Sequence, residues 1–445
     1  MSMAEGERDE EDEEDEEGED AVFVPLEESN ASQYRVLDDL TGTAGDVDLD
    51  EDIDDDNEDE QQLPPAPRDD ASATSVVHSA PVFCIASPPS SNCSLTCLVS
   101  GAGDDSAALH SLREPAHIES TSTLPSTHSD SIASLSFNAD GTLFASASLD
   151  GSLSVWRSDS HSHFHLLHLL EGPDGGIESV CWHPKGDVVL AGSEDFTAWM
   201  WSASDGCYMG LFSGHHAAIS ECAFTRDGKG ALTASADGTV RLWQPKTGEC
   251  FSSVTAQEAG AVTCMHTHPN GSLLITGGED GSACIVSISG DVPSQAAKLN
   301  RVSTLEGASM PIESVGFCPS QPIAAVASHD GQTRLYDVNT STLRSTCAQT
   351  HRCTQHAPEH APESGTAAVT AVAWNPTAPA LLATAGSDGA VMLWDARTGA
   401  SVATLLGHSQ AVLDLCFTAS GNALFTASDD HQCKLFDVRV AVGAR

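Results

Sequence analysis

Histidine, serine, aspartate and an aromatic residue recur at a fixed spacing in this chain of 445 residues. His128, Ser148, Asp150 and Trp156 are separated by 20, 2 and 6 positions. An imidazole, a hydroxyl and a carboxylate could form the catalytic triad of a hydrolase, in which histidine takes the proton of serine. The same groups, with an indole N–H, could instead satisfy one another as hydrogen-bond donors and acceptors in a structural network.

The number of copies decides between these two interpretations. The same three intervals recur in two further sets, namely His215, Ser235, Asp237 and Trp243, and His408, Ser428, Asp430 and Phe436. A catalytic triad is needed once in an active site, whereas a structural network can recur in every repeat. We therefore interpret these residues as a structural tetrad and predict that the chain is not an enzyme.

The aspartate of each set lies in a segment that recurs along the chain. One copy, AGSEDFTAWMW (residues 191–201), places Asp195 between small residues and two tryptophans. Eight copies can be aligned, and their turn acids are Asp104, Asp150, Asp195, Asp237, Asp280, Asp330, Asp388 and Asp430. Their spacings of 42 to 58 residues are typical of a repeat array such as a β-propeller.

The elements that position these residues follow from the hydrophobic pattern. Small and apolar residues alternate on both sides of an Asp-Gly turn, which predicts a hairpin. Another short strand, such as IESVCW or ISECAF, precedes each hairpin. With a variable fourth strand, the sequence predicts an all-β propeller of eight four-stranded blades in residues 71–445. An open last blade would expose a strand edge, so residues 72–77 are expected to pair with residues 432–436 and close the ring.

Charge excludes several kinds of partner. The formal net charge is −46, and residues 1–70 hold 30 of the 65 acidic residues but only 3 of the 19 basic ones. Acidic runs of this kind repel themselves and bury little apolar surface, so residues 1–70 are predicted to be a disordered tail. An acidic protein has no electrostatic reason to bind nucleic acid or an anionic membrane. We expect basic protein partners, no direct nucleic-acid binding, no membrane insertion and a monomer.

Metal and cofactor motifs are absent from the sequence. The 14 cysteines are spread singly without a CxxC zinc pattern, which favours free thiols in a reducing cytosol. Two histidine-rich stretches, HSHFHLLH (residues 161–168) and HRCTQHAPEHAPESGTA (residues 351–367), are interpreted as solvated loops rather than metal sites. We therefore predict no cofactor and no metal.

Propeller topology assigns the charges to two rims. The turn between the second and third strand of a blade (b and c) and the connection from its fourth strand (d) to the next blade share one rim, which we call the top rim. Asp429 and eight further acids are expected there as a partner-binding surface: Asp130, Asp174, Glu178, Glu194, Glu221, Glu279, Glu313 and Asp414. The bases Lys185, Arg226, Lys229, Lys246 and Arg397 fall in turns of the opposite, bottom rim.

These repeats resemble the WD-repeat family. The Gly-His pairs at 214–215 and 407–408 and the Trp-Asp pair at 394–395 match its two characteristic dipeptides. The acidic tail, HSAPVFC (residues 78–84) and IESVGFCPSQPIAAVASHDG (residues 312–331) are similar to the angio-associated migratory cell protein family, which has a yeast relative in ribosome assembly. The insert at residues 351–367 departs from that pattern.

The resemblance implies a binding protein rather than an enzyme. The yeast relative implies a chaperone that holds the basic N-terminal segment of a large-subunit ribosomal protein on an acidic propeller face, in the cytoplasm or also in the nucleus. The alternative is a signalling scaffold, since animal members of the family are linked to cell migration and angiogenesis. The two functions differ in their partner, and neither follows from the spacings above.

Overall fold

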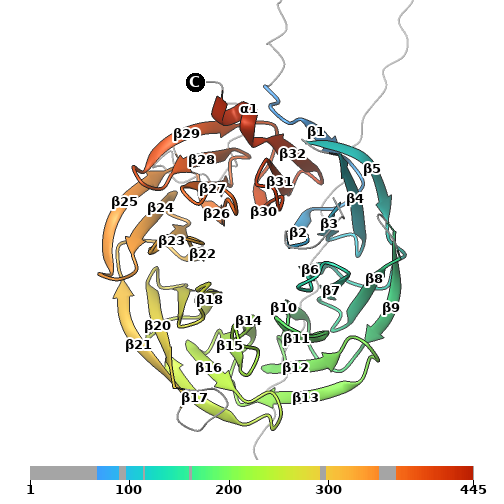
Figure 1. Cartoon of the computed structure of the whole chain (residues 1–445), viewed down its shortest axis with the longest axis vertical. Coiled ribbons are helices and arrows are strands. Elements are labelled where there is room, and N and C mark those ends of the chain that lie inside the picture. Colours follow the sequence, from blue (N-terminus) through green and yellow to red (C-terminus); the bar gives the residue numbers. More distant parts are fainter. Residues whose placement is uncertain are drawn as a thin grey trace, which may run out of the picture. The chain divides into compact units, whose positions relative to one another are not determined.

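The computed structural model describes residues 68–89, 97–113, 116–159, 163–290, 297–349 and 367–443. These residues form eight four-stranded antiparallel sheets, which follow one another around a ring (Figure 1). The predicted all-β propeller of eight blades is confirmed. The predicted acidic tail lies outside the described residues, except for residues 68–70.

Each blade runs from an innermost strand a to an outermost strand d. Blades one to four contain β2 (Val82–Ala86), β3 (Cys97–Ala102), β4 (Ala107–Arg113) and β5 (His117–Thr123); β6 (Ile132–Phe137), β7 (Leu143–Ser148), β8 (Leu153–Ser158) and β9 (Phe164–Leu170); β10 (Ile177–Trp182), β11 (Val188–Ser193), β12 (Thr197–Ser202) and β13 (Tyr208–Ser213); and β14 (Ile219–Phe224), β15 (Ala231–Ser235), β16 (Thr239–Trp243) and β17 (Cys250–Thr255). Blades five to seven contain β18 (Val262–Thr267), β19 (Leu273–Gly278), β20 (Ala283–Ser289) and β21 (Lys298–Leu305); β22 (Ile312–Phe317), β23 (Ile323–Ser328), β24 (Gln332–Asp337) and β25 (Thr342–Ala348); and β26 (Val369–Trp374), β27 (Leu381–Gly386), β28 (Val391–Asp395) and β29 (Ala400–Leu405). Blade eight contains β30 (Val412–Phe417), β31 (Ala423–Ser428), β32 (Cys433–Asp437) and, as its outer strand, β1 (Ala73–Ser75); helix α1 (Val438–Gly443) follows.

Small residues in the b strands let neighbouring blades pack face to face. Strand β7, with the sequence LFASAS, is buried at every position. Where glycine stands in a b strand, the next blade fills the space: a Cβ atom on Gly192 would lie 2.6 Å from Ile219 Cγ2, and one on Gly277 would lie 2.5 Å from Ile312 Cγ2. A larger side chain would therefore push two blades apart, which explains the small residues of the repeat.

The turn aspartates join the two kinds of loop on the top rim. In blade four, Asp237 Oδ1 accepts the N–H of Thr239 at 2.9 Å within the b–c turn, while Oδ2 accepts the N–H of His216 at 3.0 Å from the preceding d–a connection. The equivalent inter-loop bonds have lengths of 2.7 to 3.2 Å and end on Asp104, Asp150, Asp195, Asp330 and Asp430. We call this pair of bonds the aspartate latch. Asp195 is thus a structural acid.

Histidine and tryptophan share one hydroxyl beneath the latch. His215 Nδ1 lies 2.9 Å from Asp237 Oδ2, and its Nε2 lies 2.7 Å from Thr233 Oγ1. Trp243 Nε1 donates to the same hydroxyl at 2.7 Å. Because all three polar groups are buried, the network supplies the hydrogen bonds that water would otherwise provide.

The hydroxyl of the tetrad differs from the predicted one in each set. The predicted Ser235 donates to Ala217 O at 2.9 Å and accepts the N–H of Asp237 at 3.1 Å, so it belongs to the latch. Ser148 and Ser428 make the same pair of bonds, and Ser146 and Thr426 take the place of Thr233. The prediction of Ser148, Ser235 and Ser428 as histidine partners was therefore wrong by two residues.

The remaining tetrad residues vary between the three blades. His408 lies 2.9 Å from Asp430, as in blade four, and Phe436 packs edge-on against its ring without a hydrogen bond. In blade two, His128 Nδ1 bonds to Ser152 Oγ at 2.8 Å and lies 3.9 Å from Asp150 Oδ1. Trp156 donates to Ser146 at 3.1 Å. Burial lowers the pKa of His215 despite the hydrogen bond that Asp237 accepts from it, and the imidazole is therefore neutral near pH 7.

Blade one contains a fourth tetrad that the spacing rule missed. His78 Nε2 lies 2.8 Å from Ser100 Oγ, which also lies 2.8 Å from His110 Nε2. A second imidazole therefore stands in the place of the indole. Burial and the charge of His78 lower the pKa of His110 to about 3, so the second imidazole is neutral as well.

The two ends of the described chain close the ring together, as predicted. In the β1–β32 pair, Thr74 lies opposite Lys434 and Ser75 opposite Cys433. Two residues assigned to the tail strengthen the closure: Asp69 forms an ion pair with the buried Lys434 at 2.6 Å, and Asp70 exchanges backbone and side-chain bonds with Leu406. The part of the chain that contacts blade eight therefore begins before residue 71.

We predict that β1 is required for the stability of the propeller. A chain that starts at residue 68 keeps β1 and Asp69, and its melting temperature should match that of the full chain. A chain that starts at residue 77 lacks β1 but keeps His78, exposes β32 and should melt more than about 5 °C lower. Differential scanning fluorimetry compares the two. Equal melting temperatures would show that β1 does not close the ring.

The shared hydroxyl of blade four gives a second prediction. Thr233→Val keeps the shape of the side chain but leaves His215 Nε2 and Trp243 Nε1 without their partner, which should lower the free energy of unfolding by about 1–3 kcal/mol in urea. Thr276→Val is the matched control, because Thr276 occupies the equivalent position in blade five and makes only a 3.5 Å bond to Cys284 O. Equal losses in the two variants would argue against the network.

Candidate functional site

The predicted partner-binding acids fall into three structural classes. Asp130 and Asp174 lie in d–a connections, and Glu194, Glu279 and Asp429 lie in b–c turns. The other four lie in the first half of an inner strand: Glu178 in β10, Glu221 in β14, Glu313 in β22 and Asp414 in β30. Because the aspartate latch joins b–c turns to d–a connections, the loop acids occupy one rim. The inner-strand acids follow the same connections directly.

Two inner-strand carboxylates are only partly exposed and are held in place by hydrogen bonds. Glu221 Oε1 accepts a hydrogen bond from Ser179 Oγ at 3.2 Å, and burial raises its pKa to about 7 despite that bond. Asp414 accepts the N–H groups of Ile85 at 2.9 Å and Leu415 at 2.7 Å. Burial raises its pKa to about 6 against these two bonds. Both acids therefore change charge near neutral pH.

The other two inner-strand acids have charged or titratable neighbours. Burial, followed by the negative charge of Glu194, raises the pKa of Glu178. Glu313 Oε1 lies 3.2 Å from His329 Nε2, and both side chains are more than a third exposed. Cys264, in β18 between these strands, has a pKa that burial and the charges of Glu221 and Glu313 raise to about 12. Glu221 and Glu313 thus act on one common region of the inner strands.

The exposed loop acids spread the negative charge around the rim. Asp130, Asp174, Glu194 and Glu279 are exposed, and within the described residues none of them forms an ion pair. Asp130 accepts only the N–H of its neighbour Ser131, at 2.7 Å. These carboxylates are open to a partner.

Two basic residues near the top rim are neutralised by acids, whereas Arg241 lies over the ring of Trp243 and forms no ion pair among the described residues. Arg334 bonds to Asp330 at 2.8 Å with both side chains buried, and Lys434 is paired with Asp69. The sequence analysis did not foresee these pairs. Lys185, Arg226 and Lys229 lie in a–b turns and Lys246 and Arg397 in c–d turns, which antiparallel strands place on the opposite rim.

Apolar side chains on the same rim escaped the sequence analysis. Phe196 follows the latch acid Asp195, is 46% exposed and has a φ of 71°. Leu149 and Met310 are exposed in a b–c turn and a d–a connection. The signal was present in AGSEDFTAWMW, where phenylalanine stands at the glycine position of the turn. Behind it, Trp201 is buried and Trp199 stacks on Trp201 with 6.0 Å between ring centroids, so both act as core.

The described residues show other candidate sites to be weak. Among them, no group of three or more histidine, cysteine, aspartate or glutamate side chains is arranged to hold a metal ion. The insert at residues 351–367 lies almost wholly outside the described part. Eight of the twelve cysteines in the described ranges are buried, and all twelve are free thiols. No described helix has the length and hydropathy required to cross a membrane.

Comparison with known proteins agrees with the repeat pattern. The family pattern described as WD domain, G-beta repeat matches residues 119–157, 164–202, 206–244, 248–287, 299–337, 351–395 and 399–437. Most of these segments begin at an outer strand and end at strand c of the next blade. The inner strands of blade one lie outside them, which agrees with its divergent tetrad.

Relatives of known name extend the similarity to most of the chain. Angio-associated migratory cell proteins of Canis lupus familiaris and Homo sapiens are each 32% identical over 380 residues, covering 83% of this chain and 80% or 81% of theirs. Among solved structures, Chaetomium thermophilum Sqt1 bound to the N-terminus of the ribosomal protein L10 superposes with a TM-score of 0.70 at 22% identity, covering 83% of this chain and 100% of the other. Saccharomyces cerevisiae Sqt1 gives 0.69 at 19% identity, covering 83% and 99%. The chain belongs to the WD-repeat family and, within it, to the angio-associated migratory cell protein family.

Proposed function

We propose that the protein is an escort that captures a basic segment of a partner protein on its top rim, and that the partner is a newly made ribosomal protein of the large subunit. The observation that carries the proposal is the separation of charge. Carboxylates without an ion pair are exposed on one rim, where Arg334 and Lys434 are paired with acids and Arg241 is not, while Lys185, Lys229 and Lys246 lie in turns of the other rim. A surface of one sign attracts and orients a partner of the opposite sign.

The nature of the partner rests on similarity. The Chaetomium Sqt1 structure, whose fold this chain shares, contains the N-terminus of the ribosomal protein L10. Carrying that partner over to this chain is part of our proposal, as is a cytoplasmic site of action. If the protein is instead a signalling scaffold, a pull-down should recover cortical signalling proteins rather than ribosomal ones.

The energetics favour a rim with many weak contacts. Exposed charge pairs contribute about 0.2–1 kcal/mol each, so no single acid can hold a peptide. Several carboxylates around one opening can do so together, and exposed Phe196, Leu149 and Met310 add apolar surface. Because charges are screened over about 8 Å at physiological salt, binding should weaken steeply as salt increases.

Charge reversal tests the assigned rim. Glu178→Lys with Glu313→Lys should weaken binding of a basic peptide by about tenfold or more, because each change replaces an attraction with a repulsion. Lys185→Glu with Lys229→Glu is the matched control on the bottom rim and should have little effect. Isothermal titration with the N-terminal peptide of the ribosomal protein at two salt concentrations measures both. Loss of binding only in the bottom-rim variant would show that the rim is wrongly assigned, and binding that depends on neither variant nor salt would contradict the escort function.

The raised pKa values of Glu221 and Asp414 predict a dependence on pH. Both acids ionise as the pH rises through about 6 to 7, so affinity for a basic peptide should increase between pH 5.5 and pH 8. The stability change has the opposite sign. Because folding raises the pKa of Glu221 above its usual value of 4.5, its contribution is fully present below about pH 4.5 and is lost as the pH rises through about 7.

Glu221→Gln separates the two effects. The variant should bind the peptide less tightly than the unaltered chain at pH 8, yet melt at a higher temperature at that pH, while at pH 5 the two should agree in both measurements. Thermal unfolding and titration at the two pH values provide the comparison. A variant that is less stable at pH 8 would show that Glu221 is satisfied as an anion in the fold.

A further inference from the structure

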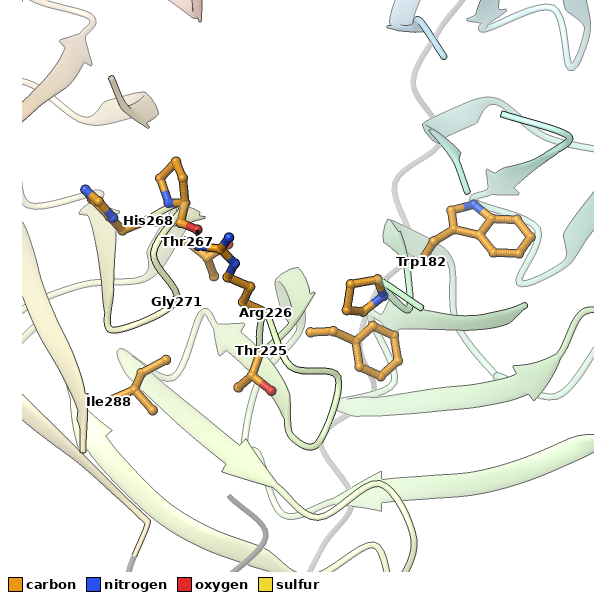
Figure 2. Close-up of a pocket in the computed structure, with 10 residues that line it drawn as sticks. Trp182, Thr225, Arg226, Thr267, His268, Gly271 and Ile288 are labelled. Carbon is orange, nitrogen blue, oxygen red and sulfur yellow. Dashed lines mark hydrogen bonds between the residues drawn. The ribbon is translucent and has the colours of Figure 1, made fainter. Parts of the chain in front are cut away.

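Three successive a–b turns enclose a cleft on the bottom rim. The turns follow β10, β14 and β18, and the cleft has two adjoining parts of about 230 Å³ and about 430 Å³. Thr225, Arg226, Gly271 and Ile288 line both parts. In Figure 2, Arg226 lies between Trp182 on one side and Thr267 and His268 on the other. We call this feature the bottom cleft.

Contacts from blade to blade fix the walls of the bottom cleft. His183 Nε2 bonds to Gly228 O at 3.0 Å, and Lys185 Nζ donates to Asp227 O at 3.3 Å, which joins the turns of blades three and four. Arg226 donates to Pro269 O and thereby joins blades four and five. A Cβ atom on Gly228 would overlap the ring of His183, so this glycine is required for the close approach of the two turns. The cleft is therefore formed before any ligand arrives.

The smaller part of the cleft has both apolar and polar walls. Its lining includes Trp182, Pro184, Phe224, Pro269 and Ile288. Trp182 Nε1 already donates to Ser136 O at 2.9 Å and the residue is only 8% exposed, so the indole offers a ligand a small part of its ring and no polar group. His183 packs edge-on against Phe224, with 5.2 Å between ring centroids, and supports the floor. This part is suited to a large apolar side chain.

The larger part is cationic. Lys185, Arg226 and Lys229 line it, and all three are exposed. Asp227 is the carboxylate among the lining residues. Burial would raise the pKa of Asp227. Hydrogen bonds from Lys229 N and Thr225 Oγ1, together with the charges of nearby lysines, outweigh this effect and lower the pKa, so Asp227 stays ionised. Three positive charges and one negative charge leave this part positive.

Among the a–b turns, lysine and arginine occur only in those of blades three and four. In the sequence, the a–b turns of blades two, six, seven and eight contain no lysine or arginine, and that of blade two contains Asp140 instead. In a chain with a net charge of −46, three bases on two adjacent turns are a local exception. A cluster of positive charge beside an apolar hollow indicates a ligand that is acidic and also carries an apolar group.

We propose that the bottom cleft binds an acidic segment of a partner protein that carries a large apolar side chain. Carboxylates of the segment would pair with Lys185, Arg226 and Lys229, while the apolar side chain fills the space between Trp182, Phe224 and Ile288. A long polyanion such as RNA fits less well. Its phosphates would extend more than about 8 Å from the cleft, where the net negative charge of the rest of the chain repels them. The proposal is independent of the basic partner on the top rim.

The test uses a labelled acidic peptide, Glu-Glu-Phe-Glu-Glu, and fluorescence anisotropy with the full chain. Binding should weaken about threefold to tenfold in the double variant Lys185→Gln and Lys229→Gln, since each exposed charge contributes modestly. The matched control, Lys246→Gln with Arg344→Gln, removes two exposed positive charges elsewhere and should change the affinity by less than twofold. A probe with alanine in place of phenylalanine should bind at least about fivefold more weakly.

Several results would overturn the proposal. If the control variant weakens binding as much as the cleft variant, the attraction is general and not local. If the alanine probe, tripolyphosphate or an oligonucleotide binds as tightly as the phenylalanine probe, the apolar part has no role and the cleft is a plain anion site. Unchanged binding in the Lys185→Gln and Lys229→Gln variant would place the peptide outside the bottom cleft.

Discussion

The hydrogen bonds of the turn aspartates are the constraint on which the rest of the structure depends. Each latch closes a hairpin within one blade and holds the connection that leads into that blade. For Asp237 burial opposes ionisation, but the bonds to Thr239, His215 and His216 outweigh it and lower the pKa to about 2. The acid therefore stays ionised at all physiological pH values. It adds a fixed negative charge to the rim that it builds, so the fold itself makes that rim acidic.

Repetition made the architecture predictable, because the same physical requirement recurs in every blade. The eight units, the turn acids and the closure by residues 72–77 all followed from patterns that a single sequence displays. The hydroxyl of the tetrad did not. Ser146 and Ser148 lie two positions apart in one strand, so their side chains point to the same face and period-two alternation cannot distinguish them. The spacing of the other tetrads did not reveal the tetrad of blade one, because its histidine lies 22 residues before its hydroxyl instead of 18.

The charges of the site were only partly predictable for a different reason. Sequence topology assigns an acid to a rim, but it does not show which base will reach that rim through space. Asp69 and Lys434 are 365 positions apart in the chain, and their pairing neutralises one negative and one positive charge. Burial also divides carboxylates of the same type: Glu221 has a pKa raised to about 7, whereas Glu194 is exposed in the turn of the neighbouring blade. The bottom cleft needed the structure too, since three separate turns form it.

Phe196 connects the latch with the function of the top rim. The residue after the turn acid has a φ between 62° and 81° in all eight blades, and glycine fills this position in five of them. Asp105 and His431 are polar residues that adopt this backbone with modest strain, whereas a bulky aromatic residue does so at a cost of about 1–2 kcal/mol. Phe196 is 46% exposed, so only part of its side chain packs against blade three. A strained aromatic side chain beside Glu194 is better explained by contact with a partner, because an apolar anchor among weak charge pairs would supply the contact area that carboxylates alone lack.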